Sequence, residues 1–272
     1  MAEALPLNDY ISQRYGPAKL GRLVRYLLFA LLLVLLAGWQ AKVNIPELLA
    51  DLPTGLSKLA TFFPPLWSAL PGLVQPALVT ILLALLPLPI GMVLSLPVAL
   101  AAARNIAPAD LRFLTRAYIT FQRNFPEFIL VLLLVRAFGL GPYPGIVAIA
   151  LGTVGMLAKL WADAIEEVDP KILESLEATG ASHFQIIRYG VIPEIMPALI
   201  AHSIFRFEVN MRQAGLLGAV GAGGLGWELS YSLNLLEYER VTVTFLFLLL
   251  LILVAEKVSD FLRRRILEAQ LK

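Results

Sequence analysis

Long apolar runs separated by short polar stretches dominate the order of residues along this chain. The first run contains LLFALLLVLLAGW, a segment of 13 residues without a charge. A helix needs about 20 mainly apolar residues to cross the hydrocarbon core of a bilayer, so runs of this kind predict membrane spans. The pattern predicts an all-α integral membrane protein with about six transmembrane helices, at residues 24–41, 73–103, 125–138, 147–161, 195–220 and 241–258.

The second and third predicted spans are less regular than the others. Residues 73–103 are long enough to cross with tilt, and Pro87, Pro89 and Pro97 are expected to kink the helix. Residues 125–138 are short for a span and need residues 119–121 ahead of them to reach the required length. The sequence defines the ends of the third and fourth spans least sharply.

Basic residues predict the orientation, because Lys and Arg gather on the cytoplasmic side of membrane proteins. They are frequent before the first span, between the second and third, and after the last, and sparse in the other connections. This places both termini in the cytoplasm, with tails at 1–23 and 263–272 around a transmembrane domain at 24–262. The cations on the cytoplasmic side are Arg14, Lys19, Arg22, Arg25, Arg104, Arg112, Arg116, Arg123, Lys257, Arg263, Arg264, Arg265 and Lys272.

Composition agrees with this class and excludes several others. Apolar residues make up 58% of the 272 and charged residues 15%, outside the usual range of soluble domains. The chain has no cysteine, which excludes disulfides and thiol chemistry, and its only histidines, His183 and His202, are too far apart to suggest a metal site. The first apolar run lacks a convincing cleavage site, so we expect it to be a retained helix.

The segment ESLEATGASHFQIIRYGVIP, at 174–193, is the most polar long stretch outside the predicted spans. It resembles the EAA loop of ABC-importer permeases, with a glutamate, a glycine six positions later and a proline thirteen beyond that. Leu176 and Gly190 depart from the pattern, where alanine and isoleucine are usual. The resemblance implies a cytoplasmic coupling loop at about 163–193, docked on an ATPase subunit through Glu174, Glu177, Ala178, Gly180, Ala181, Phe184 and Pro193.

Local signals in this loop predict an elbow of two short helices. Good helix formers run up to Gly180, which should stop the first helix where a bulky side chain would clash, and Ser182 is placed to cap the second. The alternative interpretation is an amphipathic loop that is only solvated. If the coupling role holds, ATP and Mg²⁺ belong to partner subunits, because this chain has no Gly-Lys-Ser/Thr phosphate loop.

A glycine-rich run, GAVGAGGLG, matches the G-x-G-x-x-G spacing of dinucleotide-binding proteins at Gly221, Gly223 and Gly226. That motif needs a strand before it and a βαβ unit around it, and here it follows an apolar helix. We interpret the run as a tight, irregular connection at the outer membrane face. It gives no reason to expect an enzyme.

Three further segments, RYGVIP, FRFEVNMR and VGAGGLG, follow in the order and spacing of the phosphonate/phosphite branch of these permeases, as do residues 62–65 and 139–146. This resemblance implies a type I ABC-importer permease in the bacterial inner membrane. It also implies a second copy of the chain, two ATPase subunits, an extracytoplasmic binding protein and a phosphorus oxyanion as cargo. Another small solute such as an amino acid, or an ion-coupled secondary carrier, remains the alternative.

The fifth predicted span carries polar residues where they are costly, which marks them as candidates for an aqueous pathway. His202, Arg206, Asn210 and Gln213 follow at helical spacing and are interpreted as one stripe along the translocation path. Glu208 and Arg212, four apart, are expected to form a structural ion pair on another face.

The role of Arg206 stays open at this point. Its guanidinium suits phosphorus oxyanions if it has no counter-ion. The competing interpretation pairs it with Glu127 in the third span. Arg123 and Glu127, four apart around Pro126, are themselves interpreted as a pair that neutralises its own charge.

Overall fold

The computed structural model describes residues 17–42 and 44–270, and throughout these ranges its regular elements are helices. The chain divides into two compact units, Met1–Ala60 and Thr61–Lys272. The predicted N-terminal tail falls largely on residues 1–16, outside the described residues.

The first unit contains two helices, α2 (Pro17–Gln40) and α3 (Ile45–Ala60). The apolar part of α2, Gly21–Gln40, is long enough to cross a membrane, which agrees with the first predicted span. Its leucines are exposed within this chain, as expected for side chains that lipid or a partner surrounds.

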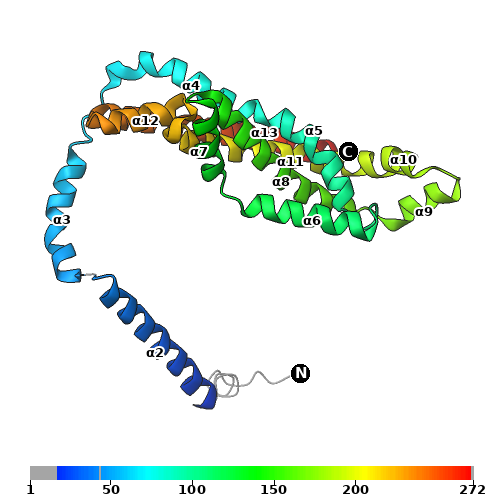
Figure 1. The fold of residues 1–272 in the computed structure, drawn as a ribbon, viewed down its shortest axis with the longest axis horizontal. Coiled ribbons are helices and arrows are strands. Elements are labelled where there is room, and N and C mark those ends of the chain that lie inside the picture. Colours follow the sequence, from blue (N-terminus) through cyan, green and yellow to red (C-terminus); the bar gives the residue numbers. More distant parts are fainter. Residues whose placement is uncertain (1–16, 43, 271–272) are drawn as a thin grey trace, which may run out of the picture. The chain divides into compact units, whose positions relative to one another are not determined.

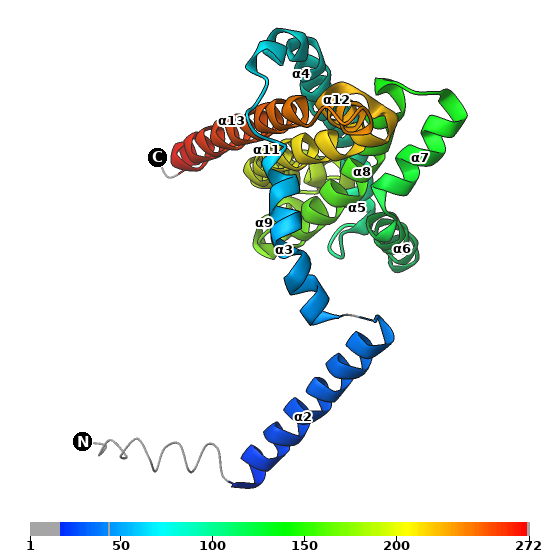
Figure 2. The same ribbon diagram turned by 90° about the vertical axis from the view of Figure 1, so that its left-hand side faces the viewer.

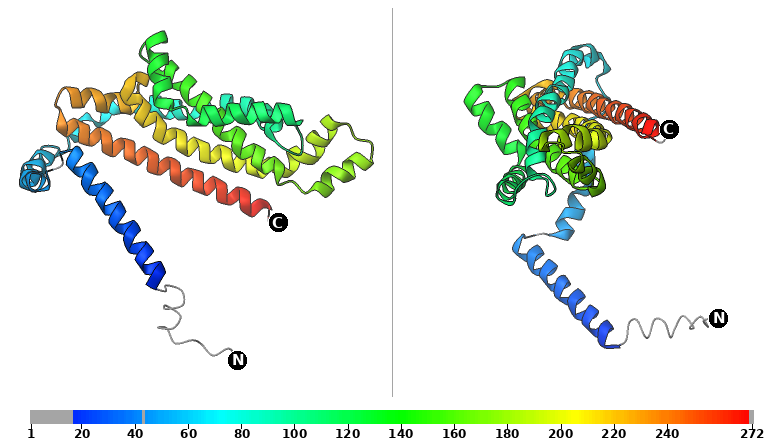
Figure 3. Two further views of the ribbon diagram at one scale, coloured as in Figure 1. Left: turned by 60° about the horizontal axis from the view of Figure 1, so that its bottom comes forward. Right: turned by 90° about the vertical axis from the view of Figure 1, so that its right-hand side faces the viewer.

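The second unit is a bundle in which α8 packs against α5, α6, α7 and α11 (Figure 1). The helix α13 runs along α11 (Figure 3). The elements in chain order are η1 (Trp67–Ala69), α4 (Leu70–Leu85), α5 (Pro87–Ala102), α6 (Ala109–Asn124), α7 (Glu127–Phe138), α8 (Pro142–Glu166), α9 (Pro170–Ala178), α10 (His183–Ile186), η2 (Ile187–Val191), α11 (Ile192–Leu217), η3 (Gly218–Ala222), α12 (Gly224–Asn234) and α13 (Tyr238–Gln270).

Within the described residues, five helices are long and apolar enough to span a membrane, and a bent helix pair raises this to six. The second span is Trp67–Ala102, because Leu86 keeps helical angles (φ −63°, ψ −36°) between α4 and α5. The fourth, fifth and sixth spans lie within Pro142–Glu166, His183–Ala222 and Tyr238–Ile266. Each begins earlier than the apolar run alone predicts.

The third span differs most from its prediction, since no single helix covers residues 119–138. The helices α6 and α7 meet at an angle of 82° (Figure 2). Phe125 has an extended ψ of 120°, because a residue before proline is forced out of the helical region, and Pro126 is also extended with a ψ of 119°. The chain is therefore broken inside this span, and α7 turns away from the line of α6.

Small residues allow α5 and α8 to pack closely. A methyl group on Gly91 would lie 2.2 Å from Thr153 Cγ2, so this contact requires glycine. Ser95 Oγ donates its proton to Gly91 O at 2.5 Å, with Val154 O of α8 as a second, more distant acceptor at 3.3 Å, which satisfies its hydroxyl in the core. At the end of α8, Glu166 accepts hydrogen bonds from the backbone and side chain of Arg104 and pairs with Arg116. These contacts tie the connection before α6, and the middle of α6, to the end of α8.

Candidate functional site

The elbow formed by α9 and α10 lies at the end of the bundle away from α12 (Figure 1). Asp169 caps α9 by accepting a hydrogen bond from Lys171 N at 2.9 Å. Gly180 ends it with a φ of +79°, and its N–H donates to Glu177 O at 2.9 Å. The predicted break at Gly180 is confirmed. The predicted clash is wrong, because a side chain there would meet nothing within 4 Å, and the backbone angle alone requires glycine.

The second half of the elbow runs without interruption into the fifth span. Ser182 stands at the predicted N-cap, and its N–H donates to Gln185 Oε1 at 2.7 Å in a capping box. The π-turn η2 then joins α10 to α11, with Pro193 in the first turn of α11. A rotation of α10 would therefore pass directly to α11.

The two departures from the EAA pattern contact each other. Gly190 is buried, and a methyl group there would lie 2.7 Å from Leu176 Cδ1. The larger side chain at position 176 thus occupies the space that a side chain at position 190 would need. This packing holds α9 against η2.

The residues predicted to contact an ATPase subunit are accessible. Glu174, Glu177, Ala178, Gly180 and Pro193 are exposed, and Ala181 is half-buried. Phe184 is 67% exposed on this otherwise polar elbow. An exposed phenylalanine is typical of a protein-binding surface, so the coupling role of these residues stays a prediction that their exposure supports.

A second candidate site lies around Arg206, midway along α11. The guanidinium is 3% exposed and pairs with Glu127 Oε1 at 3.1 Å. It also donates hydrogen bonds to groups on α8 and to one further residue of α11, so that all its nitrogens have partners. These acceptors are Thr153 Oγ1, Met156 Sδ, Ile149 O and Gln213 Oε1.

This geometry shows which charges in this region are paired. Glu127 pairs with Arg206, as the competing interpretation proposed, so the guanidinium on the fifth span is compensated. The expected Arg123–Glu127 pair is wrong, because the 82° bend separates the helices that carry the two residues. Helical spacing predicts a pair only when the helix continues through it.

The predicted polar stripe on α11 does not line one surface. Arg206 and Gln213 line a cleft of about 420 Å³ between α6, α7, α8 and α11. Asn210 is fully buried and donates to Ala84 O of α4 at 3.1 Å, and His202 is half-buried outside the cleft. The pathway role of these four residues stays a prediction, which the cleft supports best for Arg206 and Gln213.

The predicted Glu208–Arg212 ion pair on α11 is confirmed, and a third residue, Arg263 of α13, joins it. Arg212 donates to Glu208 Oε1 at 2.9 Å. Arg263, near the end of α13, approaches Glu208 Oε2 at 3.5 Å. Since α13 continues to Gln270, the region predicted as a tail from residue 263 includes a residue that ties α13 to α11.

The sequence suggested Gln122 and Asn124 as further polar lining, and the cleft includes Gln122 and not Asn124. Sequence reasoning missed Phe125, Phe128 and Gly152, which also line the cleft. The amide of Gln122 donates to Leu151 O, and a side chain on Gly152 would collide with Glu127. The signal available in the sequence was the cluster of polar residues around Pro126. These residues line one cleft only because the chain bends between α6 and α7.

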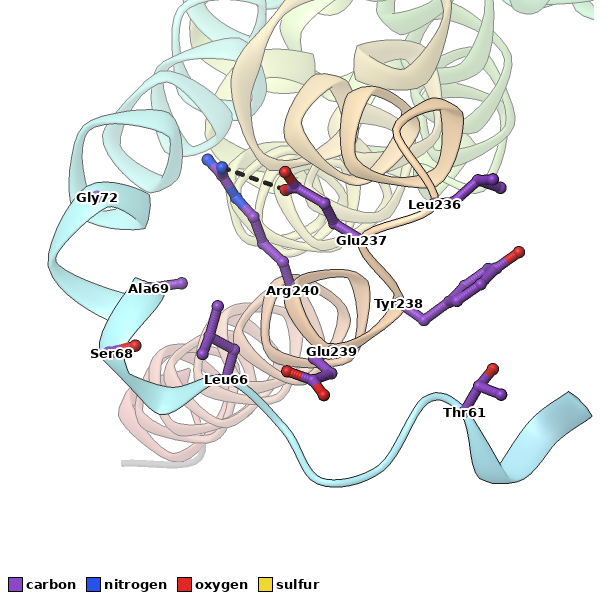
Figure 4. Close-up of a pocket in the computed structure, with 10 residues that line it drawn as sticks. All are labelled: Thr61, Leu66, Ser68, Ala69, Gly72, Leu236, Glu237, Tyr238, Glu239 and Arg240. Carbon is purple, nitrogen blue, oxygen red and sulfur yellow. Dashed lines mark ion pairs between the residues drawn. The ribbon is translucent and has the colours of Figure 1, made fainter.

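A larger cavity of about 660 Å³ lies at the turn between α12 and α13. Figure 4 shows the side chain of Arg240 directed toward Glu237, with Glu239 nearby. Arg240 pairs with Glu228 at 2.9 Å and with Glu237 at 3.6 Å. This cavity is poorly suited to an anion, because carboxylates compensate Arg240 and Glu239 also lines the cavity.

The glycine-rich run is an irregular connection, as predicted. Val220 and Gly221 leave the helical region inside η3, and Gly141 N donates to Gly221 O at 2.9 Å. A methyl group on Gly226 would lie 2.0 Å from Gly215 O, so α12 folds back in close contact with α11. The glycines of this run therefore allow α12 to pack closely on α11.

The fold and these two sites define a multi-pass α-helical membrane protein with a polar elbow outside its bundle and a polar cleft inside it. Residues 91–268 match the family described as "Binding-protein-dependent transport system inner membrane component". The chain is 36% identical over 239 residues to the putative phosphite transport system permease protein HtxC of Stutzerimonas stutzeri, which covers 88% of this chain and 85% of that one. It is 35% identical over 233 residues to the phosphite transport system permease protein PtxC of the same organism, covering 85% of each chain.

A solved structure shows the same fold. An inward-facing form of the MetNI methionine ABC transporter matches with a TM-score of 0.63 and 24% identity, covering 71% of this chain and 95% of that chain. This chain therefore belongs to this family, the inner membrane components of binding-protein-dependent transport systems.

Proposed function

We propose that this chain forms the translocation pathway of an ATP-driven importer for phosphonate, phosphite or a related phosphorus oxyanion. The observation that carries the proposal is its similarity to two phosphite permeases over at least 85% of this chain and of each relative. The cleft agrees with it, since it has cationic and amide side chains on a wall inside the bundle.

The proposed assembly contains two copies of this chain, two ATPase subunits and an extracytoplasmic binding protein, in the inner membrane with both termini cytoplasmic. ATP and Mg²⁺ belong to the ATPase subunits, and this chain supplies no catalytic residue. Glu174, Glu177, Ala178, Gly180, Ala181, Phe184 and Pro193 make the ATPase contact, which α10 transmits to α11 through η2.

An amino acid is the competing cargo, because the matching solved structure is a methionine transporter. At 24% identity that match supports the fold and says little about the cargo. The two proposals differ in what the cleft must accept, since a phosphorus oxyanion is a net anion and methionine is a zwitterion.

The test is ATP hydrolysis by the assembled complex with its binding protein. We expect phosphite or a phosphonate to stimulate hydrolysis and methionine to have no effect, while the purified chain alone hydrolyses no ATP. Stimulation by methionine and by no phosphorus oxyanion would overturn the proposed cargo. ATP turnover by the chain alone would overturn its assignment as a permease without catalytic activity.

A further inference from the structure

The cations around the cleft differ in whether a carboxylate compensates them. Arg206 pairs with Glu127, Arg116 with Glu166, and Lys159 with Asp163. Arg123, on the last turn of α6, is exposed and makes no ion pair with any described residue. Of the cations that line the cleft, Arg123 is therefore the one whose charge is available.

Arg123 lines two neighbouring cavities. It belongs to the wall of the 420 Å³ cleft together with Arg206 and Gln213. It also lines a smaller cavity of about 120 Å³ between α5, α6 and α8, which contains Arg116 and Lys159. An anion that moves from one cavity to the other would pass this side chain.

The bend of the third span explains how an uncompensated cation is tolerated here. The helix α6 ends at Asn124, so Arg123 lies in its last turn. The partial negative charge at a helix C-terminus stabilises a cation, and the open cleft leaves the guanidinium hydrated. The bend also carries Glu127 onto α7, where it pairs with Arg206 and leaves Arg123 free.

We propose that Arg123 is the residue that binds the oxyanion during its passage through the membrane. This inference rests on the proposed function and deepens it. A guanidinium presents a planar pair of donors that matches two oxygens of a phosphorus oxyanion. Arg206 is less suited to this role, because it is 3% exposed and its donors already have protein partners. Gln122 and Gln213, on the same cleft wall, supply polar side chains beside Arg123.

Chemical restoration of the charge tests this role, because the chain has no cysteine of its own. The complex carrying Arg123→Cys is reconstituted in proteoliposomes with its ATPase and binding protein, and phosphite uptake is measured. We expect at least a ten-fold loss of uptake at an unchanged amount of assembled complex. Aminoethyl methanethiosulfonate, which attaches an ammonium group, should restore much of the uptake, and uncharged methyl methanethiosulfonate should not.

Arg112→Cys is the matched control, because Arg112 is on the same helix and lines neither cavity. Its uptake should stay within two-fold of the unsubstituted complex, which is also treated with both reagents. Arg123→Lys, which keeps the charge, should retain part of the uptake.

Normal phosphite uptake by Arg123→Cys, or equal restoration by both reagents, would overturn this inference and leave the proposed function intact. Loss of the assembled complex would also overturn it, because Arg123 would then have a structural role. Failure of the unsubstituted complex to take up any phosphorus oxyanion would overturn the proposed function, and this inference with it.

Discussion

The Arg206–Glu127 pair joins a cation and an anion inside the membrane-spanning bundle, at 3.1 Å and with side-chain exposures of 3% and 21%. A buried pair of this kind contributes little net stability, but the loss of one partner strands the other charge. The pair also attaches α7 to α11 beside the bend. We therefore expect the pair to fix the wall of the cleft.

Removing either partner should destabilise the folded chain. We expect Arg206→Ala and Glu127→Ala each to lower the free energy of unfolding by about 3–5 kcal/mol, and the double substitution to recover much of it. Arg212→Ala is the matched control on the same helix, and it should cost about 1 kcal/mol or less because that side chain is 46% exposed. Thermal unfolding of the purified complex measures these differences. A double variant as unstable as the worse single variant would contradict the pairing.

A second prediction concerns Leu176 and Gly190. Gly190→Ile, which restores the residue usual in the EAA pattern, should overpack the elbow and cost about 1–3 kcal/mol. Adding Leu176→Ala should relieve much of this cost, because Leu176 Cδ1 fills the space next to Gly190. The two changes should therefore be strongly non-additive in thermal unfolding. Additive effects would show that the two residues do not compensate for each other.

At the scale of single residues, the sequence predicted the local partners well. The Glu208–Arg212 pair, the break at Gly180 and the cap at Ser182 depend on neighbours within a few positions. The partners of Arg206 and Glu127 lie on different helices, and their contact follows from how α7 turns at Pro126. No spacing rule within one helix contains that information.

At the scale of the elements, the elbow and the bent third span have the most direct functional consequences. The elbow joins α11 through helical and π-helical turns, so it moves with that span. The bend between α6 and α7 forms part of the wall of the cleft that Arg206 also lines. Apolar runs predicted where the spans lie, but hydropathy carries no information on backbone angles, and the 82° bend was not predicted.

The backbone of Gly180 provides a prediction for the elbow. Its φ of +79° favours glycine or asparagine and strains a β-branched residue. Gly180→Val should abolish uptake and uncouple ATP hydrolysis while the chain still inserts in the membrane, and Gly180→Asn should retain most of the activity. Uptake and ATP hydrolysis are measured on the same reconstituted complexes. Equal, normal uptake by both variants would show that the elbow does not transmit the motion.

At the scale of the whole molecule, the positions of the spans and the polar loop followed from the sequence because both depend on long segments of uniform character. The resemblance of 174–193 to the EAA loop added the class of protein, which the family match then established.

Two copies of the chain are expected in the complete transporter. Large apolar side chains remain exposed at the rim of the cleft, including Leu216 at 63% and Phe128 at 41%. A second copy would cover such a rim and enclose the path, which one chain leaves open. Native mass measurement of the intact complex should give two copies of this chain with two ATPase subunits. A complex with a single copy would contradict the proposal.

Uptake of phosphite into proteoliposomes tests the central claim most directly. The vesicles contain this chain with its ATPase, the binding protein is added outside, and ATP is enclosed within. We predict ATP-dependent accumulation of phosphite that excess methionine does not reduce and that disappears when ATP is replaced by a non-hydrolysable analogue. Accumulation of methionine with no uptake of phosphite, phosphonate or phosphate would contradict the account.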